Sequence, residues 1–302
     1  NNDPDPYAES TGGMAKGRNV SARPLPAGIL GHWAAKVRKP TSSIPLTYEE
    51  IVDNHFFSNP KKWALRYAPR LFWRSLRKIR TRGNSLTVGL LKGCLDIGIE
   101  IRTNTLAKRL LMTNGSISGI EIAIEGGLVE VQVTKGVVLA SGGFEWDQEM
   151  MNQYFPGPVE WTASPSSNTG DGQKMALEVG AHLDRMDQAL IMGTTPVHYE
   201  GRVQGQPAAD YFLPHSMIVN GDGKRFVNEK QMNIGLAFNE RDIETGMPKN
   251  LPAWRIYDNQ FAKKYPHALP SKKMKDNFYQ ASSLEELGRL INVNPKNLTE
   301  TA

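Results

Sequence analysis

A helical period of apolar residues runs through positions 61–82. The apolar residues lie three or four positions apart and predict a helix with one apolar face, made of Leu65, Ala68, Phe72, Leu76 and Ile79. A second face is basic, with Arg66, Arg70, Arg74 and Arg77. Because proline cannot donate the helical hydrogen bond, Pro69 is expected to kink this helix or to mark its start.

Further helices are expected along the chain. One begins at Asn84 and Ser85, which resemble a cap, and ends near Gly98. Its predicted inward face consists of Leu86, Leu90, Leu91, Cys94 and Leu95. Two others are expected at 173–183 and 283–292, whereas 1–60 are expected to be irregular with short helices.

The middle of the chain has the pattern of strands. Short segments alternate apolar and polar residues at 110–113, 117–125 and 128–134, and a short strand is also expected at 99–102. Asn114–Gly115 and Gly126–Gly127 are hairpin signals between them. Residues 136–140 are continuously apolar, which is typical of a buried parallel strand. From about residue 190 the pattern changes to mixed short strands and loops.

Composition narrows the class of protein. A length of 302 residues fits one large domain or two moderate ones. The sequence contains no uninterrupted stretch of 18 apolar residues, so no membrane span is expected. Cys94 is the only cysteine, so an internal disulfide is excluded, a cysteine metal site is implausible, and a cytoplasmic location is expected. The net charge of +5 is too small to indicate a nucleic-acid partner.

Two glycine-containing segments have the composition of ligand-binding turns. The apolar run ends in Ser141, Gly142 and Gly143, and glycine lets a backbone approach a ligand closely. Residues 168–172 place glycines beside Asp171 just before a predicted helix, so that backbone amides converge there. Each segment alone is equally compatible with a tight turn or a capped helix.

Taken together, several segments resemble the fumarate reductase and 3-ketosteroid dehydrogenase superfamily of flavoproteins. The similarity is carried in order along the chain by residues 83–105, 139–144, 168–181, 217–229, 252–258 and 283–287. The resemblance implies an α/β fold: a Rossmann-like FAD domain over 1–189, including the hairpin and the basic helix, and an α+β capping domain over 190–302.

The resemblance also implies site residues and a noncovalently bound FAD. The expected cofactor contacts are Ala107, Ala140, Ser141, Gly142, Gly143, Asn168, Thr169, Gly170, Asp171 and Gly172. The family's N-terminal G-x-G-x-x-G and its C-terminal flavin segment are missing from this sequence, so both FAD domain and capping domain are expected to be incomplete. A catalytically silent flavoprotein fragment is therefore the alternative to an active FAD-dependent oxidoreductase.

The branch of the superfamily follows from charged residues. Fumarate reductases clamp a dicarboxylate with arginine and histidine. The matching positions here lack these residues. Residues 192–196 contain no histidine, Ala262 replaces the proton-donating arginine, and Lys230 stands where those enzymes place another arginine. Dicarboxylate reduction is thus disfavoured, and an apolar ketone is the expected substrate.

The 3-ketosteroid dehydrogenase branch is the better match. Its enzymes pass a hydride to flavin and a proton to a tyrosine, but Asn233 stands where that tyrosine is expected. Tyr211 and Tyr7 are the candidate replacements. The resemblance places the substrate at Thr195, Pro214, His215 and Ser216.

The basic segment 61–82 contains no acidic residue and fits two interpretations. It forms either a peripheral contact with an anionic membrane surface or a solvated helix face held by its apolar stripe. The oligomeric state and the electron acceptor are not indicated by the sequence.

Overall fold

The structure is a computed structural model. It describes residues 21–41, 44–47, 49–50, 60–155, 157, 159, 161–207, 211, 213–231, 233–265 and 278–302. The chain forms two compact units, Asn1–Ile101 with Ala262–Leu269, and Arg102–Phe261 with Pro270–Ala302. The sequence-based boundary near 190 concerns the roles of the two parts of the chain and stays a prediction.

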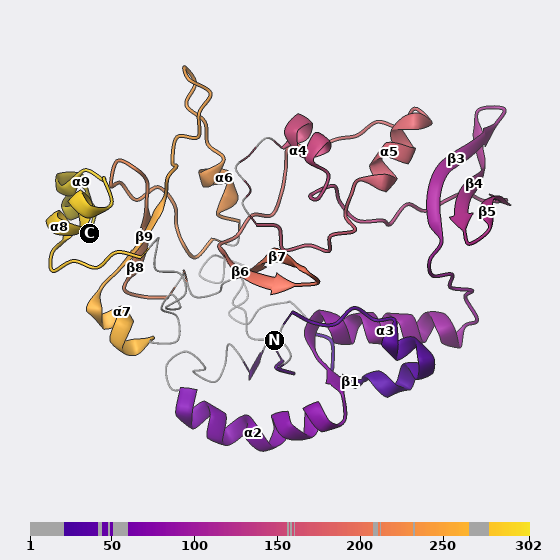
Figure 1. The fold of residues 1–302 in the computed structure, drawn as a ribbon, viewed down its shortest axis with the longest axis horizontal. Coiled ribbons are helices and arrows are strands. Elements are labelled where there is room, and N and C mark those ends of the chain that lie inside the picture. The colour runs from indigo at the N-terminus through magenta and orange to yellow at the C-terminus, as the bar shows by residue number, and fades with distance from the viewer. Residues whose placement is uncertain are drawn as a thin grey trace, which may run out of the picture. The chain divides into compact units, whose positions relative to one another are not determined.

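The first unit is mainly helical (Figure 1). Its described elements are β1 (Leu25–Pro26), the 3₁₀ helix η1 (Ala27–Ala35), α2 (Pro60–Leu76), β2 (Ile79–Arg80) and α3 (Arg82–Asp96). β1 pairs with β2 in antiparallel fashion, Leu25 opposite Arg80. This short ladder connects the segment before α2 with the turn that follows it.

Helix α2 packs through a face that the periodicity did not select. The buried residues are Trp63 and Tyr67, which form a core cluster with Leu46 and half-buried Leu71. The helix runs through Pro69, so the expectation that Pro69 marks its start is wrong. The apolar face predicted from the sequence lies on the outside, because Leu65, Phe72 and Leu76 are all exposed.

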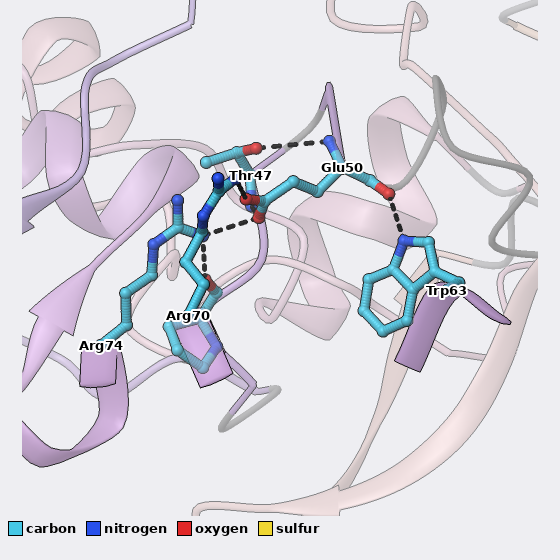
Figure 2. A network of polar contacts seen from close by, with 6 residues as sticks. Thr47, Glu50, Trp63, Arg70 and Arg74 are labelled. Carbon is cyan, nitrogen blue, oxygen red and sulfur yellow. Dashed lines mark hydrogen bonds and ion pairs between the residues drawn. The ribbon is translucent and has the colours of Figure 1, made fainter. Parts of the chain in front are cut away.

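A buried carboxylate holds the inner face of α2 (Figure 2). Glu50 accepts hydrogen bonds from Arg74 at 2.6 Å and from Arg70 at 3.2 Å, while the Trp63 indole donates to its backbone carbonyl at 2.8 Å. Burial alone raises the pKa of Glu50, but the hydrogen bonds from Arg74, Thr47 and Arg70 outweigh it, so that the pKa is lowered. The ionised carboxylate is therefore part of the folded structure.

Replacing Glu50 by glutamine should destabilise the chain by about 1–3 kcal/mol, since charge-assisted hydrogen bonds to both arginines are weakened. A carboxyl whose pKa is lowered by folding contributes stability above its ordinary pKa of 4.5 and loses it as the pH falls through the lower folded value. Urea unfolding of both proteins should show the difference near neutral pH and its disappearance in acid.

The exposed Glu125, on a hairpin turn, provides the matched control, and Glu125→Gln should leave stability nearly unchanged. An equal destabilisation by Glu50→Gln at neutral and acidic pH would show that the ionised form of Glu50 is not what stabilises α2.

Helix α3 begins and packs differently from the expectation. It starts at Arg82 with Thr81 as its cap, three positions before Ser85, whose buried hydroxyl donates to the carbonyl of Arg23. Its end before Gly98 is confirmed, with Gly98 at φ +77°. Buried Val88 faces inward, whereas Leu86 and Leu90, expected inside, are exposed. Leu91, Cys94 and Leu95 are half-buried.

The second unit begins with a three-stranded antiparallel meander. It consists of β3 (Leu106–Thr113), β4 (Ser116–Ile124) and β5 (Gly127–Gln132), in the order β3-β4-β5. Asn114 and Gly115 both have positive φ, 52° and 77°, as a tight hairpin turn requires. The predicted hairpins are confirmed. The strand expected at 99–102 is not formed.

Residues 136–140 correct another expectation. They do not form a buried strand: Val138 is 91% exposed and Leu139 is 36% exposed. A parallel strand needs neighbouring strands for its backbone groups. All strand pairs in the described part of the chain are antiparallel, and none includes this segment. The extended run therefore leads unpaired into the Gly-Gly turn.

The rest of the second unit alternates short helices and strand pairs. Its elements are α4 (Gln148–Tyr154), α5 (Asp171–Glu178), β6 (Thr194–Tyr199), β7 (Arg202–Pro207), β8 (Ser216–Val219), α6 (Gly235–Phe238), β9 (Trp254–Tyr257), the first half of α7 (Asn259–Lys264), α8 (Leu284–Leu290) and α9 (Pro295–Thr301). The helices expected at 173–183 and 283–292 are confirmed as the shorter α5 and α8. Two hydrophobic clusters lie on opposite sides of β8, one around Val219 with Ile256 and Leu298, the other around Ile218.

The turn after β8 explains one of the segments that carry the resemblance. Gly223 has φ +79°, and a side chain there would meet the backbone of Asn294 and Leu298 at 3.0 Å. Buried Glu229 accepts from the amide of Ile218 at 2.8 Å and pairs with Arg225. This motif therefore fixes β8 against the C-terminal helices. Among the residues that the structure describes, every helix is too short or too polar to span a bilayer.

Candidate flavin site

The two glycine-containing segments predicted to bind a cofactor lie against each other. The amide of Gly170 donates to the carbonyl of Gly143 at 3.0 Å, and the amide of Trp146 donates to the carbonyl of Asn168 at 3.0 Å. Gln173 in α5 donates from Nε2 to the carbonyl of Gly142 at 3.1 Å. Residues 27 positions apart are thus joined by backbone contacts into one structural unit.

Close packing accounts for the glycines. Gly142 has φ +89°, and a Cβ there would lie 2.5 Å from Oδ1 of Asn168. Gly170, the cap of α5, is left-handed at φ +74°. A side chain at Gly172 would collide with the hydroxyl of Ser141. Larger residues at these positions would displace the neighbouring side chains, and at Gly142 and Gly170 they would also strain the backbone.

The surroundings of the turn offer acceptors that sequence reasoning missed. Oε2 of Glu145 and Oε1 of Gln173 are buried, and no described residue donates a hydrogen bond to either atom. Buried acceptors without partners are costly unless a ligand or water donates to them. Ala140, Ser141 and Gly142 are exposed beside them. A polar residue directly after Phe144 was the only signal in the sequence that pointed to Glu145.

Helices α4 and α5 are held at this site by charge. Asp147 caps α4 by accepting from the amide of Met150 at 2.8 Å, and it pairs with Lys174 of α5 at 2.5 Å. The hydrogen bond from Lys174, followed by that from Met150, lowers the pKa of Asp147. The hydroxyl of Thr169 donates to the carboxylate of Asp171 at 3.0 Å, so these two predicted contact residues are hydrogen-bonded to each other. Ala107 lies on β3, which packs against α5.

The β6–β7 hairpin lies next to this site. The guanidinium of Arg202 lies 5.3 Å from the ring centre of Trp146, and the amide of Gly205 donates to the carbonyl of Thr162 at 3.0 Å. Thr195, a predicted substrate contact, is on β6 opposite Gln206. The strand that carries Thr195 is therefore tied to the segment that follows the Gly-Gly turn.

The other predicted substrate residues, Pro214, His215 and Ser216, lie at the start of β8. The hydroxyl of Ser216 donates to the carbonyls of Leu213 at 2.9 Å and Tyr211 at 3.3 Å. His215, at φ +69°, lies with Nδ1 3.7 Å from the carboxylate of Asp258. Pro214 and His215 are exposed.

Tyr211 is half-buried in this group. Its ring packs on the cluster around Ile218 and lies against Gly193, whose Cβ position is 2.9 Å from the ring. Burial raises the pKa of its phenol. The cause is desolvation, which disfavours the charged phenolate. The role of Tyr211 as base stays a prediction, and Tyr7 lies outside the described residues.

Asn233, at the position expected for the base, has a structural role. Its Oδ1 accepts from the amides of Ile191 at 3.2 Å and Gly235 at 3.1 Å, and its Nδ2 donates to the carbonyl of Ala189 at 2.9 Å. The side chain therefore ties the segment before β6 to α6. An amide engaged in this way cannot accept a proton.

Comparison with known proteins places the chain in a class. The family described as the FAD binding domain matches residues 9–265, so the chain belongs to this flavoprotein family, whose cofactor is FAD. The chain is 29% identical to 3-oxosteroid 1-dehydrogenase of Mycobacterium tuberculosis over 328 aligned positions, 98% of this chain and 57% of that protein. It is 26% identical to 4-oxocyclohexanecarboxylate 2-dehydrogenase of Sinomonas cyclohexanicum, over 99% of this chain and 53% of that protein.

A solved structure supports the same class of protein. The 3-ketosteroid delta1-dehydrogenase from Sterolibacterium denitrificans, in complex with 1,4-androstadiene-3,17-dione, has a TM-score of 0.78 at 28% identity, covering 99% of this chain and 58% of that chain. The chain thus spans little more than half the length of the relatives it matches. Its mixed helix and strand content and this likeness identify an α/β flavoprotein fold.

The site residues fit FAD. The orphaned acceptors Glu145 Oε2 and Gln173 Oε1 suit the hydroxyl and N–H donors of a flavin and its ribityl chain. The exposed backbone of Ala140–Gly142 allows close approach. These residues, with Asn168–Gly172, would hold the cofactor by hydrogen bonds and van der Waals contact.

Proposed function

We propose that the protein is an FAD-dependent dehydrogenase that oxidises the CH–CH bond beside a ketone in an apolar alicyclic substrate of the 3-ketosteroid type. The observation that carries this proposal is the backbone union of Gly143 with Gly170 beside two unsatisfied acceptors. The named activities of the relatives from Mycobacterium tuberculosis and Sinomonas cyclohexanicum, which both concern oxo compounds, support the substrate class. Residues 1–189 then belong to a Rossmann-like FAD domain and 190–302 to a capping domain.

The reaction removes two hydrogens from neighbouring carbons, one as a hydride and one as a proton. Bound FAD supplies the two-electron acceptor for a hydride from the carbon β to the ketone. A base removes the proton from the α-carbon, and the electron pair left behind forms the new C=C bond. Tyr211 is the proposed base, and Ser216 fixes the turn that carries it. The substrate would lie near Thr195, Pro214, His215 and Ser216.

The selectivity for a ketone over a dicarboxylate is testable with the holoenzyme. Incubation with a 3-ketosteroid and an artificial electron acceptor should give a product that lacks two hydrogens, measured by mass spectrometry. Fumarate offered to the chemically reduced holoenzyme should be reduced at least about 100-fold more slowly, because an unpaired buried carboxylate costs several kcal/mol. Efficient fumarate reduction would contradict the proposed substrate class.

A further inference from the structure

The outer face of helix α2 is apolar although it points to solvent. Leu65 is 86% exposed, Phe72 66% and Leu76 63%. They lie seven and four positions apart, directly opposite the face on which Trp63 and Tyr67 are buried. A helix held on one side by a core normally shows polar residues on the other. Helix α2 therefore presents a second apolar stripe that the described residues of its unit leave exposed.

Positive charge borders this stripe. The segment 61–82 contains no aspartate or glutamate, and its exposed basic residues other than Arg70 are Lys61, Lys62, Arg66, Arg77 and Lys78. The acidic residue Glu50 lies on the inner side of the helix, where it pairs with Arg70 and Arg74. The outer face is thus basic and apolar at once.

An aromatic side chain completes the composition of an interfacial helix. Trp73 is 55% exposed next to the stripe, and the guanidinium of Arg77 lies 5.4 Å from its ring centre. Tryptophan and basic side chains lie at the level of lipid headgroups, while leucine and phenylalanine enter the acyl boundary. Each cation near an anionic surface adds about 1 kcal/mol of attraction.

We propose that the outer face of α2 docks the protein peripherally on a membrane rich in anionic phospholipid. A second copy of the chain is the poorer occupant, because two basic faces would repel each other. Nucleic acid phosphates would match the charge but leave Leu65, Phe72 and Leu76 in water. A lipid surface satisfies both features of the face.

The membrane contact is tested by co-sedimentation of the full chain with vesicles. Vesicles of phosphatidylcholine with one part in three of phosphatidylglycerol should bind the chain at least about 10-fold more strongly than pure phosphatidylcholine. Phe72→Glu should lower this partitioning at least about 10-fold, since it places an acid in the apolar stripe. Ile243→Glu is the matched control, because Ile243 is fully exposed in the other unit, and it should bind like the parent chain.

A second readout guards against a folding defect. The tryptophan emission of the parent chain should shift to shorter wavelength with the anionic vesicles, and Trp73→Phe should remove much of that shift while far-ultraviolet circular dichroism stays unchanged. The proposal fails if both vesicle types bind equally, or if Phe72→Glu binds like the parent. It fails as well if Phe72→Glu only abolishes self-association in sedimentation velocity, or if duplex DNA displaces the vesicles.

Discussion

A valine in place of Gly142 is expected to yield a protein that purifies without FAD. Gly142 has φ +89°, which a β-branched residue adopts only with strain, and its Cβ would lie 2.5 Å from Oδ1 of Asn168. To relieve this clash, the side chain of Asn168 must move from its place beside Glu145, to which its Nδ2 donates. Strain of about 2 kcal/mol alone weakens binding roughly thirty-fold, and the added methyl groups obstruct the exposed turn.

The control separates this effect from a general defect. Gly126 also has positive φ, +109°, but a side chain there meets nothing within 4 Å. Gly126→Val should therefore retain FAD, measured as flavin absorbance per chain after gel filtration. Stoichiometric FAD in Gly142→Val would show that the assignment of this turn is wrong. Loss of FAD from both variants would show that strain in the fold, and not the turn, decides retention.

Tyr211→Phe is expected to slow the reduction of bound flavin by a 3-ketosteroid about 10²–10⁴-fold, the effect of losing a positioned base. FAD content should be unchanged, because the ring of Tyr211 packs on the cluster around Ile218 and against Gly193, neither of which is expected to hold FAD. Rapid mixing under anaerobic conditions measures the reduction step directly.

The dependence on pH distinguishes a base from a merely structural tyrosine. A base acts when deprotonated, and burial raises the pKa of Tyr211 above the ordinary value of 10.0. The reduction rate should therefore keep rising with pH up to and beyond about pH 10. Tyr211→Phe should lose this rise. Tyr257→Phe is the matched control, because burial also raises the pKa of that phenol. If Tyr257→Phe is the slow variant, or Tyr211→Phe reacts at the parental rate, Tyr211 is not the base.

The parts of the fold that the sequence predicted are those with local signals. The hairpins at Asn114–Gly115 and Gly126 follow from residues that tolerate positive φ within the turn itself. Which face of α2 packs inward depends instead on contacts with Leu46 and Glu50, which lie before the helix in the sequence and do not contribute to its hydrophobic periodicity. The same limitation explains 136–140, because an apolar run forms a strand only where a partner strand lies beside it.

The candidate site was also only partly predictable from the sequence. Glycines at 142, 143, 170 and 172 are visible in the sequence because their spacing is local, and the structure joins the two segments. Glu145 and Gln173 were missed because a single polar residue has no period, and only burial without a partner singles it out. The role of Asn233 depends on backbone groups at 189 and 191, more than forty positions away.

Anaerobic mixing of the FAD-loaded protein with a 3-ketosteroid tests the proposed dehydrogenation most directly. The visible absorbance of oxidised flavin should disappear in a single turnover, together with formation of one ring C=C bond per flavin reduced. Flavin that stays oxidised with the ketone, in a protein whose FAD content is stoichiometric, would contradict the proposed function.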